Sequence, residues 1–176
     1  MKKVLIALGV IVGVFLILGL IAPSEMNIER EIVIAKPKDV IFAQLKQLKT
    51  HNSWSPWAKR DPNIQMEYRG EDGTVGFISA WSGNDDVGVG EQEIKNIIEG
   101  ERIDLELRFK KPMEDTSAAY LITEAVDATQ TKVKWGMKGK YKFPMNVICM
   151  LLNLKKVLIK DFDEGLASMK TYMEKL

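Results

Sequence analysis

The pattern of hydrophobic and polar residues divides the chain into two parts of different character. Residues 4–22 form an uninterrupted run of 19 apolar or glycine residues without a charge. As an α-helix this run would be roughly 28 Å long, close to the ~30 Å hydrocarbon core of a bilayer. We therefore predict that residues 1–22 form a transmembrane anchor, 23–25 a short linker and 26–176 one folded domain.

Within the domain, the period of the pattern changes three times. Residues 26–35 alternate like a strand, and apolar residues then recur at helical spacing from 37 to about 49. A short second helix or turn follows at 50–58, and residues 144–176 return to helical spacing. Alternation typical of half-buried strands fills the segments between them: 64–68, 75–81, 87–98, 103–109, 116–126 and 131–142. This order predicts an α+β fold in which a curved antiparallel sheet of six to seven strands wraps around a long C-terminal helix.

The apolar run has two interpretations, a retained anchor or a cleaved signal peptide. It is longer than the roughly 7–15 apolar residues of a signal peptide. Cleavage after Ala22 would also place the bulky Leu20 and Pro23 at positions unfavourable for processing. Lys2 and Lys3 precede the run, which predicts a cytoplasmic N-terminus and an extracytoplasmic domain. We favour a single-pass anchor and keep cleavage as the alternative.

Charge and cysteine content narrow the classes of partner. The chain has 25 basic and 24 acidic residues, so it lacks the strongly basic balance typical of nucleic-acid-binding proteins. The single Cys149 excludes an intramolecular disulfide and a cysteine-based metal site. We expect no nucleic acid, metal or cofactor. Gly9 and Gly13 form a G-x-x-x-G pair, which would allow a weak homodimer through the anchor.

Several short motifs in the domain occur in a characteristic order. They are Trp54-x-x-Trp57 before Asp61-Pro62, Gly73-Thr74-Val75-Gly76 before Trp81-x-Gly83, Gly88-x-Gly90 leading to Ile94, Thr131-x-Val133-x-Trp135 leading to Gly139, and Phe162-x-x-Gly165-Leu166-x-x-Met169-Lys170. With these motifs, residues 26–176 resemble the START-like, helix-grip superfamily and its polyketide cyclase/dehydrase (SRPBCC) branch. The resemblance implies a deep, mostly apolar cavity between the sheet and the C-terminal helix. Members of the superfamily bind or transport lipids, sterols, hormones or polyketides, and a minority are enzymes.

We therefore predict a membrane-tethered binding module for a lipid or another hydrophobic small molecule. The alternative is an enzyme of cyclase, dehydratase or hydrolase type that acts on a small hydrophobic substrate in the same cavity, with His51, Asp61 or Tyr120 nearby. A third interpretation is a structural or sensory partner protein whose cavity is filled by its own side chains. The sequence assigns a catalytic role to no residue.

Aromatic and methionine side chains are the candidates for the cavity wall, because such sites are mostly apolar and aromatic. The predicted lining residues are Trp57, Phe77, Trp81, Phe109, Tyr120, Trp135, Met137 and Met150. Residues 143–152, which include Met150, are apolar on nearly all sides. We expect this segment to border the cavity mouth and to face the membrane.

Overall fold

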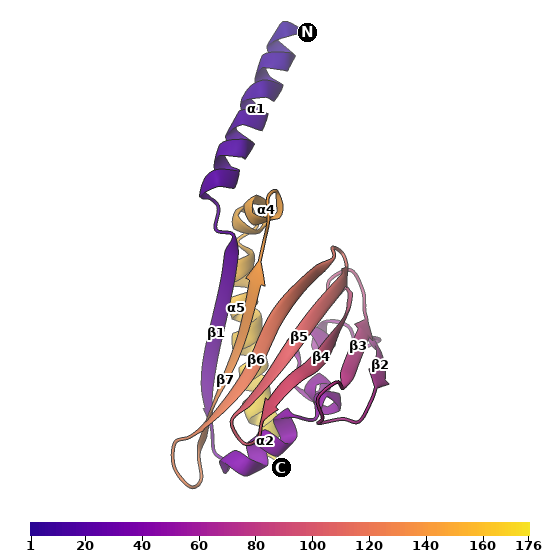
Figure 1. Ribbon diagram of the computed structural model, residues 1–176, viewed down its shortest axis with the longest axis vertical. Coiled ribbons are helices and arrows are strands. Elements are labelled where there is room, and N and C mark those ends of the chain that lie inside the picture. Colours follow the sequence, from indigo (N-terminus) through magenta and orange to yellow (C-terminus); the bar gives the residue numbers. More distant parts are fainter.

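The computed structural model describes the backbone of residues 1–176 and every side chain except that of Ile11. The helices are α1 (Lys2–Ile21), α2 (Lys38–Leu45), the 3-10 helix η1 (Leu48–Ser53), α3 (Pro56–Arg60), α4 (Met145–Leu151) and α5 (Leu154–Met173). The strands are β1 (Glu25–Ile34), β2 (Gln65–Arg69), β3 (Ile78–Ser82), β4 (Val89–Ile98), β5 (Arg102–Lys111), β6 (Asp115–Ala125) and β7 (Thr131–Lys140). Helix α1 projects from a folded domain that contains all the other elements (Figure 1).

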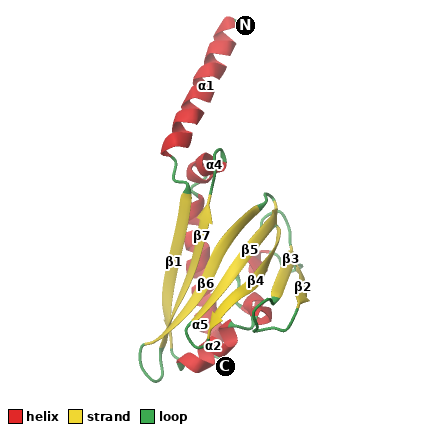
Figure 2. Cartoon of the chain, viewed as in Figure 1, coloured by secondary structure: helices red, strands yellow, loops and turns green.

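All seven strands belong to one sheet with the order β1-β7-β6-β5-β4-β3-β2. Every neighbouring pair is antiparallel. The strands form one layer, and α5 runs along one face of it (Figure 2). We call the face toward α5 the inner face and the opposite one the outer face. This arrangement confirms the α+β, helix-grip architecture expected from the sequence.

Helix α5 holds the sheet through one apolar stripe. Phe162, Leu166, Met169 and Met173 are at most 2% exposed. Gly165 lies on the same helix, where a Cβ atom would come within 2.6 Å of the Trp135 ring. Glycine at this position therefore lets the helix approach the sheet closely.

The C-terminal half of α5 also contacts the end strand of the sheet. Lys170 Nζ donates a hydrogen bond to the Val33 carbonyl of β1 (2.8 Å). Arg30 of the same strand pairs with Asp163, with 2.6 Å between Nε and Oδ1. These contacts fix α5 to the β1 side of the sheet.

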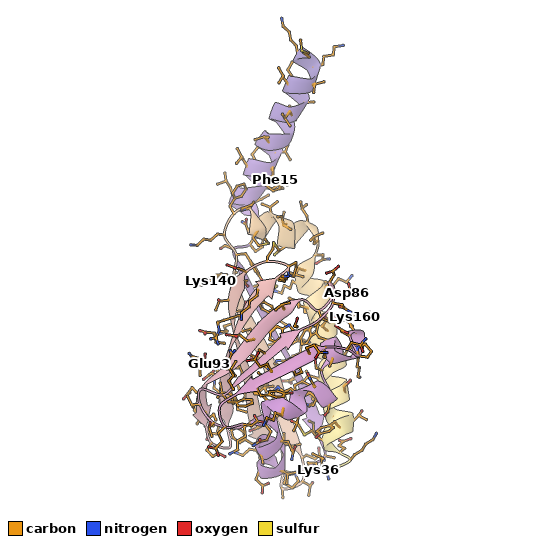
Figure 3. The ribbon with its side chains drawn as sticks, turned by 90° about the vertical axis from the view of Figure 1, so that its right-hand side faces the viewer. Phe15, Lys36, Asp86, Glu93, Lys140 and Lys160 are labelled. Atoms are coloured by element: carbon orange, nitrogen blue, oxygen red, sulfur yellow. The ribbon has the colours of Figure 1, made fainter. Side chains whose placement is uncertain are left out.

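Helix α1 is long and apolar enough to cross a membrane by its length and composition, two criteria that a signal sequence would also meet. Its last turn contacts α4: Asn146 Nδ2 donates to the carbonyls of Gly19 (3.1 Å) and Ala22 (3.2 Å). The Phe15 and Phe143 rings meet edge to face, with centroids 5.6 Å apart. Phe15 lies in the part of α1 nearest the domain (Figure 3). We call the end of the domain beside these contacts the α1-proximal end.

Two predicted helices are divided in the structure. The helical segment expected over 144–176 breaks at Asn153, whose φ of 50° lies in the left-handed region. Asparagine tolerates this conformation better than most residues, and the chain changes direction there between α4 and α5. The helix expected from 37 to about 49 ends at Leu45, and η1 follows it.

Candidate functional site

The inner face changes from fully buried to half-buried along the strands. Ile94, Leu105, Ala119 and Met137 form one cross-strand row through the register of β4, β5, β6 and β7. These residues are at most 5% exposed. This row is packed core and leaves no surface for a ligand.

Aromatic rings fill the space between this part of the sheet and α5. Trp135 of β7 lies face to face with Phe162, with ring centroids 4.3 Å apart and planes inclined by 24°. Trp54 and Trp57 meet Trp135 edge to face at 5.4 and 5.9 Å. The deep cavity implied by the resemblance is therefore occupied by the protein's own side chains along this length.

Two rows away from the buried one, the inner face is half-buried. Met66, Trp81, Gly90 and Phe109 are cross-strand neighbours on β2, β3, β4 and β5. The Trp81 and Phe109 rings meet edge to face with centroids 5.9 Å apart. Gly90 provides the space, because a Cβ atom there would lie 2.6 Å from the Trp81 ring.

A row of mixed polarity separates the aromatic pair from the core. It consists of Ser79, Gln92, Leu107 and Ser117. Gln92 and Leu107 are half-buried. Ser79 is fully buried, and its hydroxyl has no hydrogen-bond partner in the part of the chain that the structure describes. A buried hydroxyl without a partner is costly, so this position favours a polar group brought by water or a ligand.

We define the open end of the inner face as Met66, Trp81, Gln92, Leu107 and Phe109. These five side chains are all half-buried. They come from four neighbouring strands, so the rigid sheet rather than a loop positions them. Together they offer an aromatic and aliphatic surface with one amide.

The open end lies at the α1-proximal end of the domain. Phe109 pairs with Asp115 at the start of β6. Burial, followed by the charges of Asp115 and of Cys149 in α4, raises the pKa of Tyr141 to about 12. The Tyr141 amide donates to the Ser24 carbonyl in the linker after α1 (2.7 Å). Phe109 and Asp115 therefore lie at the same end of the sheet as Tyr141 and the point where α1 meets the domain.

The eight predicted lining residues lie in different parts of the structure. Trp81 and Phe109 lie together at the open end, and Trp57 is half-buried against the aromatic core. Buried in the core are Phe77, Trp135 and Met137, which are 0%, 8% and 5% exposed. Met150 lies on α4 and is 36% exposed. The eighth residue, Tyr120, lies elsewhere.

Tyr120 is on the outer face, so its placement in the cavity wall was wrong. Its strand neighbour Leu121 pairs with Trp135 on the inner face, and alternation turns Tyr120 outward. The Tyr120 ring lies over Gly136, and its hydroxyl donates to Glu29 Oε2 (2.5 Å). Burial, followed by Glu29, raises the pKa of Tyr120 to about 12. The ring borders a shallow outer depression of about 390 Å³.

The other polar residues considered for catalysis have structural roles. His51 is buried, and its Nε2 donates to the Leu45 carbonyl (2.7 Å), which connects η1 to the end of α2. Burial lowers the pKa of His51 to about 4, so the imidazole is neutral near pH 7. Asp61 accepts from the amides of Asn63 and Asn84 and so closes a loop. His51, Asp61 and Tyr120 do not converge on one site.

The sequence interpretation missed Met66, Ser79, Gln92 and Leu107. The alternation of Leu107 with Phe109 was visible in the sequence. The cross-strand neighbours of these residues were not visible, because they depend on which residues of four strands lie opposite one another. Among the described residues, no group of three or more His, Cys, Asp or Glu side chains is placed to hold a metal ion.

No protein-family model matches the chain, and no curated protein matches its sequence. Solved structures do share its fold. Truncated norcoclaurine synthase from Thalictrum flavum matches with a TM-score of 0.64 and 11% identity over 84% of this chain and 92% of its own. The Zhui aromatase/cyclase from Streptomyces sp. R1128 gives 0.62 and 11%, covering 86% of this chain and 94% of its own.

The Aha1 dimer from Colwellia psychrerythraea gives a TM-score of 0.59 and 16% identity, covering 85% of this chain and 96% of its own. At such low identities the similarity concerns the fold alone. The folded domain of this chain therefore has the helix-grip fold that these solved structures share.

Proposed function

We propose that this chain is a membrane-tethered binding module that holds a lipid or another hydrophobic small molecule at the open end of the inner face. The observation that carries the proposal is the Trp81–Phe109 pair. These two aromatic rings are half-buried on a concave sheet face, whereas the row of Ile94, Leu105, Ala119 and Met137, two rows away, is packed core. Large apolar side chains that are grouped and left partly exposed often mark a binding site.

The ligand would have an apolar body and at least one polar group. Trp81, Phe109, Leu107 and Met66 supply the apolar contact. Gln92 supplies an amide, and the unpaired Ser79 hydroxyl lies opposite it in the register. A molecule that pairs with both would be held in one orientation, because a buried polar group without a partner is penalised.

Helix α1 would remain in the membrane, with the N-terminus in the cytoplasm and the domain on the outer side. Lys2 and Lys3 support this orientation. A linker of only a few residues would keep the open end close to the bilayer and raise the effective concentration of a membrane ligand. Sealed vesicles of known sidedness, treated with protease, test the orientation. The mass of the intact protein purified from cells shows whether α1 is retained or cleaved.

We propose binding rather than catalysis for this site. Two of the proteins that share the fold are named as enzymes, a synthase and an aromatase/cyclase. Here the candidate acid–base residues lie apart: His51 is in the core and Tyr120 is on the outer face. General acid–base catalysis needs such groups within hydrogen-bond reach of one substrate.

The test compares lipids that co-purify with the full chain and with two variants. The chain is extracted in mild detergent, measured by native mass spectrometry and then solvent-extracted. Lipids around α1 are common to all samples, so the difference belongs to the domain. Trp81→Ala should lose a species that wild type retains. Val75→Ala, which truncates an exposed side chain outside the open end, should keep it. Equal lipid content in all three would overturn the proposal.

A further inference from the structure

A group of exposed apolar side chains lies on and around α4. We call it the α4 surface, and it consists of Phe143, Met150, Leu151, Leu152 and Val157. Leu151 and Leu152 are 62% and 67% exposed, although both are large aliphatic side chains. Exposed apolar groups gathered in this way indicate contact with something other than water.

The position of α4 relative to α1 identifies what that contact is. Asn146, on the buried side of α4, donates to the Gly19 and Ala22 carbonyls at the end of α1. Phe143 packs against Gly19, where a Cβ atom would overlap its ring. The α4 surface is therefore held beside the last turn of the apolar helix, as the ribbon also shows (Figure 1).

The length of α1 sets the depth of this contact. A 20-residue helix rises about 30 Å, which matches the hydrocarbon thickness of a bilayer. The last turn of α1 therefore reaches the boundary between acyl chains and headgroups. Because Asn146 of α4 is hydrogen-bonded to that end of α1, Leu151 and Leu152 lie at the same depth. Amphipathic helices at this level bury their apolar face in the boundary region.

Basic residues surround the apolar group. Lys140, Lys142, Lys155 and Lys156 are exposed and flank it in the chain. One of them, Lys140, pairs with Glu25 (3.4 Å), and its side chain remains 84% exposed. Lysines at the edge of an apolar surface are suited to anionic lipid headgroups.

From these relations we infer that the α4 surface is a second contact with an anionic bilayer. It inserts at headgroup depth beside α1 and directs the open end of the inner face toward the membrane. This inference rests on the proposed function in one respect, the retention of α1 in the membrane. It does not depend on any ligand in the domain. A hinge-like tether would leave the domain free to rotate, whereas two contacts fix its orientation.

The test measures depth in the full chain reconstituted into vesicles. Cys149, the only cysteine, is replaced by Ser. Single cysteines are then introduced as Leu152→Cys or Leu151→Cys on the α4 surface. Val12→Cys in α1 and Val126→Cys in the loop after β6 serve as matched controls, since both are exposed. Each carries an environment-sensitive fluorophore. Quenching is compared among lipids with a nitroxide near the head of the acyl chain, which report on the α4 surface, lipids with a nitroxide near the end of the acyl chain, which report on Val12, and a water-soluble quencher.

We expect the labels at Leu151 and Leu152 to be quenched by the lipid nitroxide and shielded from the aqueous quencher. The label at Val126 should show the reverse.

Adding phosphatidylglycerol to phosphatidylcholine vesicles should increase lipid quenching at Leu152, and joint Lys142→Gln, Lys155→Gln and Lys156→Gln substitutions should remove that increase. Aqueous quenching at Leu152 equal to that at Val126 would overturn the inference. So would protection from both quenchers, which would indicate a protein partner or second copy.

The controls separate this inference from the proposed function. If Val12 is quenched by lipid and Leu152 is not, the second contact fails while the anchor stands. If neither is quenched by lipid, both the anchor and the second contact fail. Lipid quenching at Leu152 combined with no difference in bound lipid between wild type and Trp81→Ala would uphold the bilayer contact and reject the ligand site.

Discussion

Trp135 of the sheet and Phe162 of α5 stack face to face, with their ring centroids 4.3 Å apart. This pair joins the two layers of the domain at the point where Gly165 brings the helix closest to the sheet. The rings fill volume that the resemblance assigns to a ligand. The aromatic residues that stabilise the domain would therefore differ from those that we propose bind the ligand on the same inner face.

The first prediction concerns this stack. Trp135→Ala should lower the free energy of unfolding by about 3–5 kcal/mol, because it removes a buried indole and leaves a cavity beneath α5. Chemical denaturation followed by circular dichroism measures the change. A loss below about 1 kcal/mol would mean that the interior collapses around the deletion and that the stack is not central to the core.

The second prediction concerns the half-buried pair. Trp81→Ala and Phe109→Ala should each cost about 1–2 kcal/mol of stability, less than Trp135→Ala, because both side chains are already partly exposed. Both should weaken binding of the lipid that co-purifies with wild type, by roughly tenfold or more for a loss of this contact area. Titration of the extracted lipid into delipidated protein measures binding. Unchanged affinity in both variants would place the ligand elsewhere.

The third prediction follows from the buried histidine. Burial lowers the pKa of His51 to about 4 from its ordinary value of 6.5. Between pH 4 and 6.5, His51 therefore binds a proton in the unfolded chain but stays neutral in the folded chain. The free energy of unfolding should have its full value above pH 6.5 and should fall as the pH drops toward 4. In His51→Gln, whose amide can still donate to the Leu45 carbonyl, this part of the pH dependence should disappear.

Denaturation curves at several pH values measure the effect. The informative quantity is the wild-type stability minus the variant stability at each pH, because carboxylates titrate equally in both proteins. A difference that stays constant between pH 6.5 and 4 would contradict the assignment of this pH dependence to His51.

The fourth prediction concerns the outer face. Glu91 is 8% exposed and accepts from Arg69 (2.8 Å), Arg108 (2.8 Å) and Lys110 (3.3 Å). The hydrogen bond from Arg69, with those from Arg108 and Lys110, lowers the pKa of Glu91 to about 2. The stabilisation is present above the ordinary pKa near 4.5 and is lost as the pH falls toward 2.

Glu91→Gln should therefore destabilise the domain at pH 7 by about 1–2 kcal/mol, a value reduced by the solvent exposure of the three cations. The difference from wild type should shrink as the pH falls from 4.5 toward 2. Glu114→Gln, in the exposed turn before β6, serves as the control and should change stability little. An equal effect of the two substitutions would show that the hydrogen bonds of Glu91 to Arg69, Arg108 and Lys110 do not stabilise the domain.

Much of the fold could be predicted from the sequence because its pattern is regular. The alternation of Ile103, Leu105 and Leu107 with charged residues corresponds to β5, and the stripe through Phe162, Leu166 and Met169 corresponds to α5. The break at Asn153 could not be predicted, because a single residue in a left-handed conformation leaves the surrounding helical spacing intact.

The site was only partly predictable, for a physical reason shown by Tyr120. The segment Ala118–Thr123 is apolar on both faces, so alternation does not reveal which side chains point inward. Tyr120 faces outward and is buried there because Gly136 leaves room for its ring and Arg102 covers it, 4.5 Å from the ring centroid. How deeply Trp135 is packed could not be predicted either, because it depends on contacts with Phe162 and Gly165 of α5.

The hydrogen bond from Lys170 to the Val33 carbonyl has a consequence for crowding. An end strand such as β1 presents unpaired backbone groups that invite pairing with another sheet. Copies confined to a membrane plane, as we propose, would collide often and with their end strands side by side. Lys170 occupies the Val33 carbonyl on this strand, and the charged side chains of Glu29 and Glu31 are exposed along it. Both features oppose such pairing. The same helix that holds the inner face together thus also helps to keep neighbouring domains from joining their sheets.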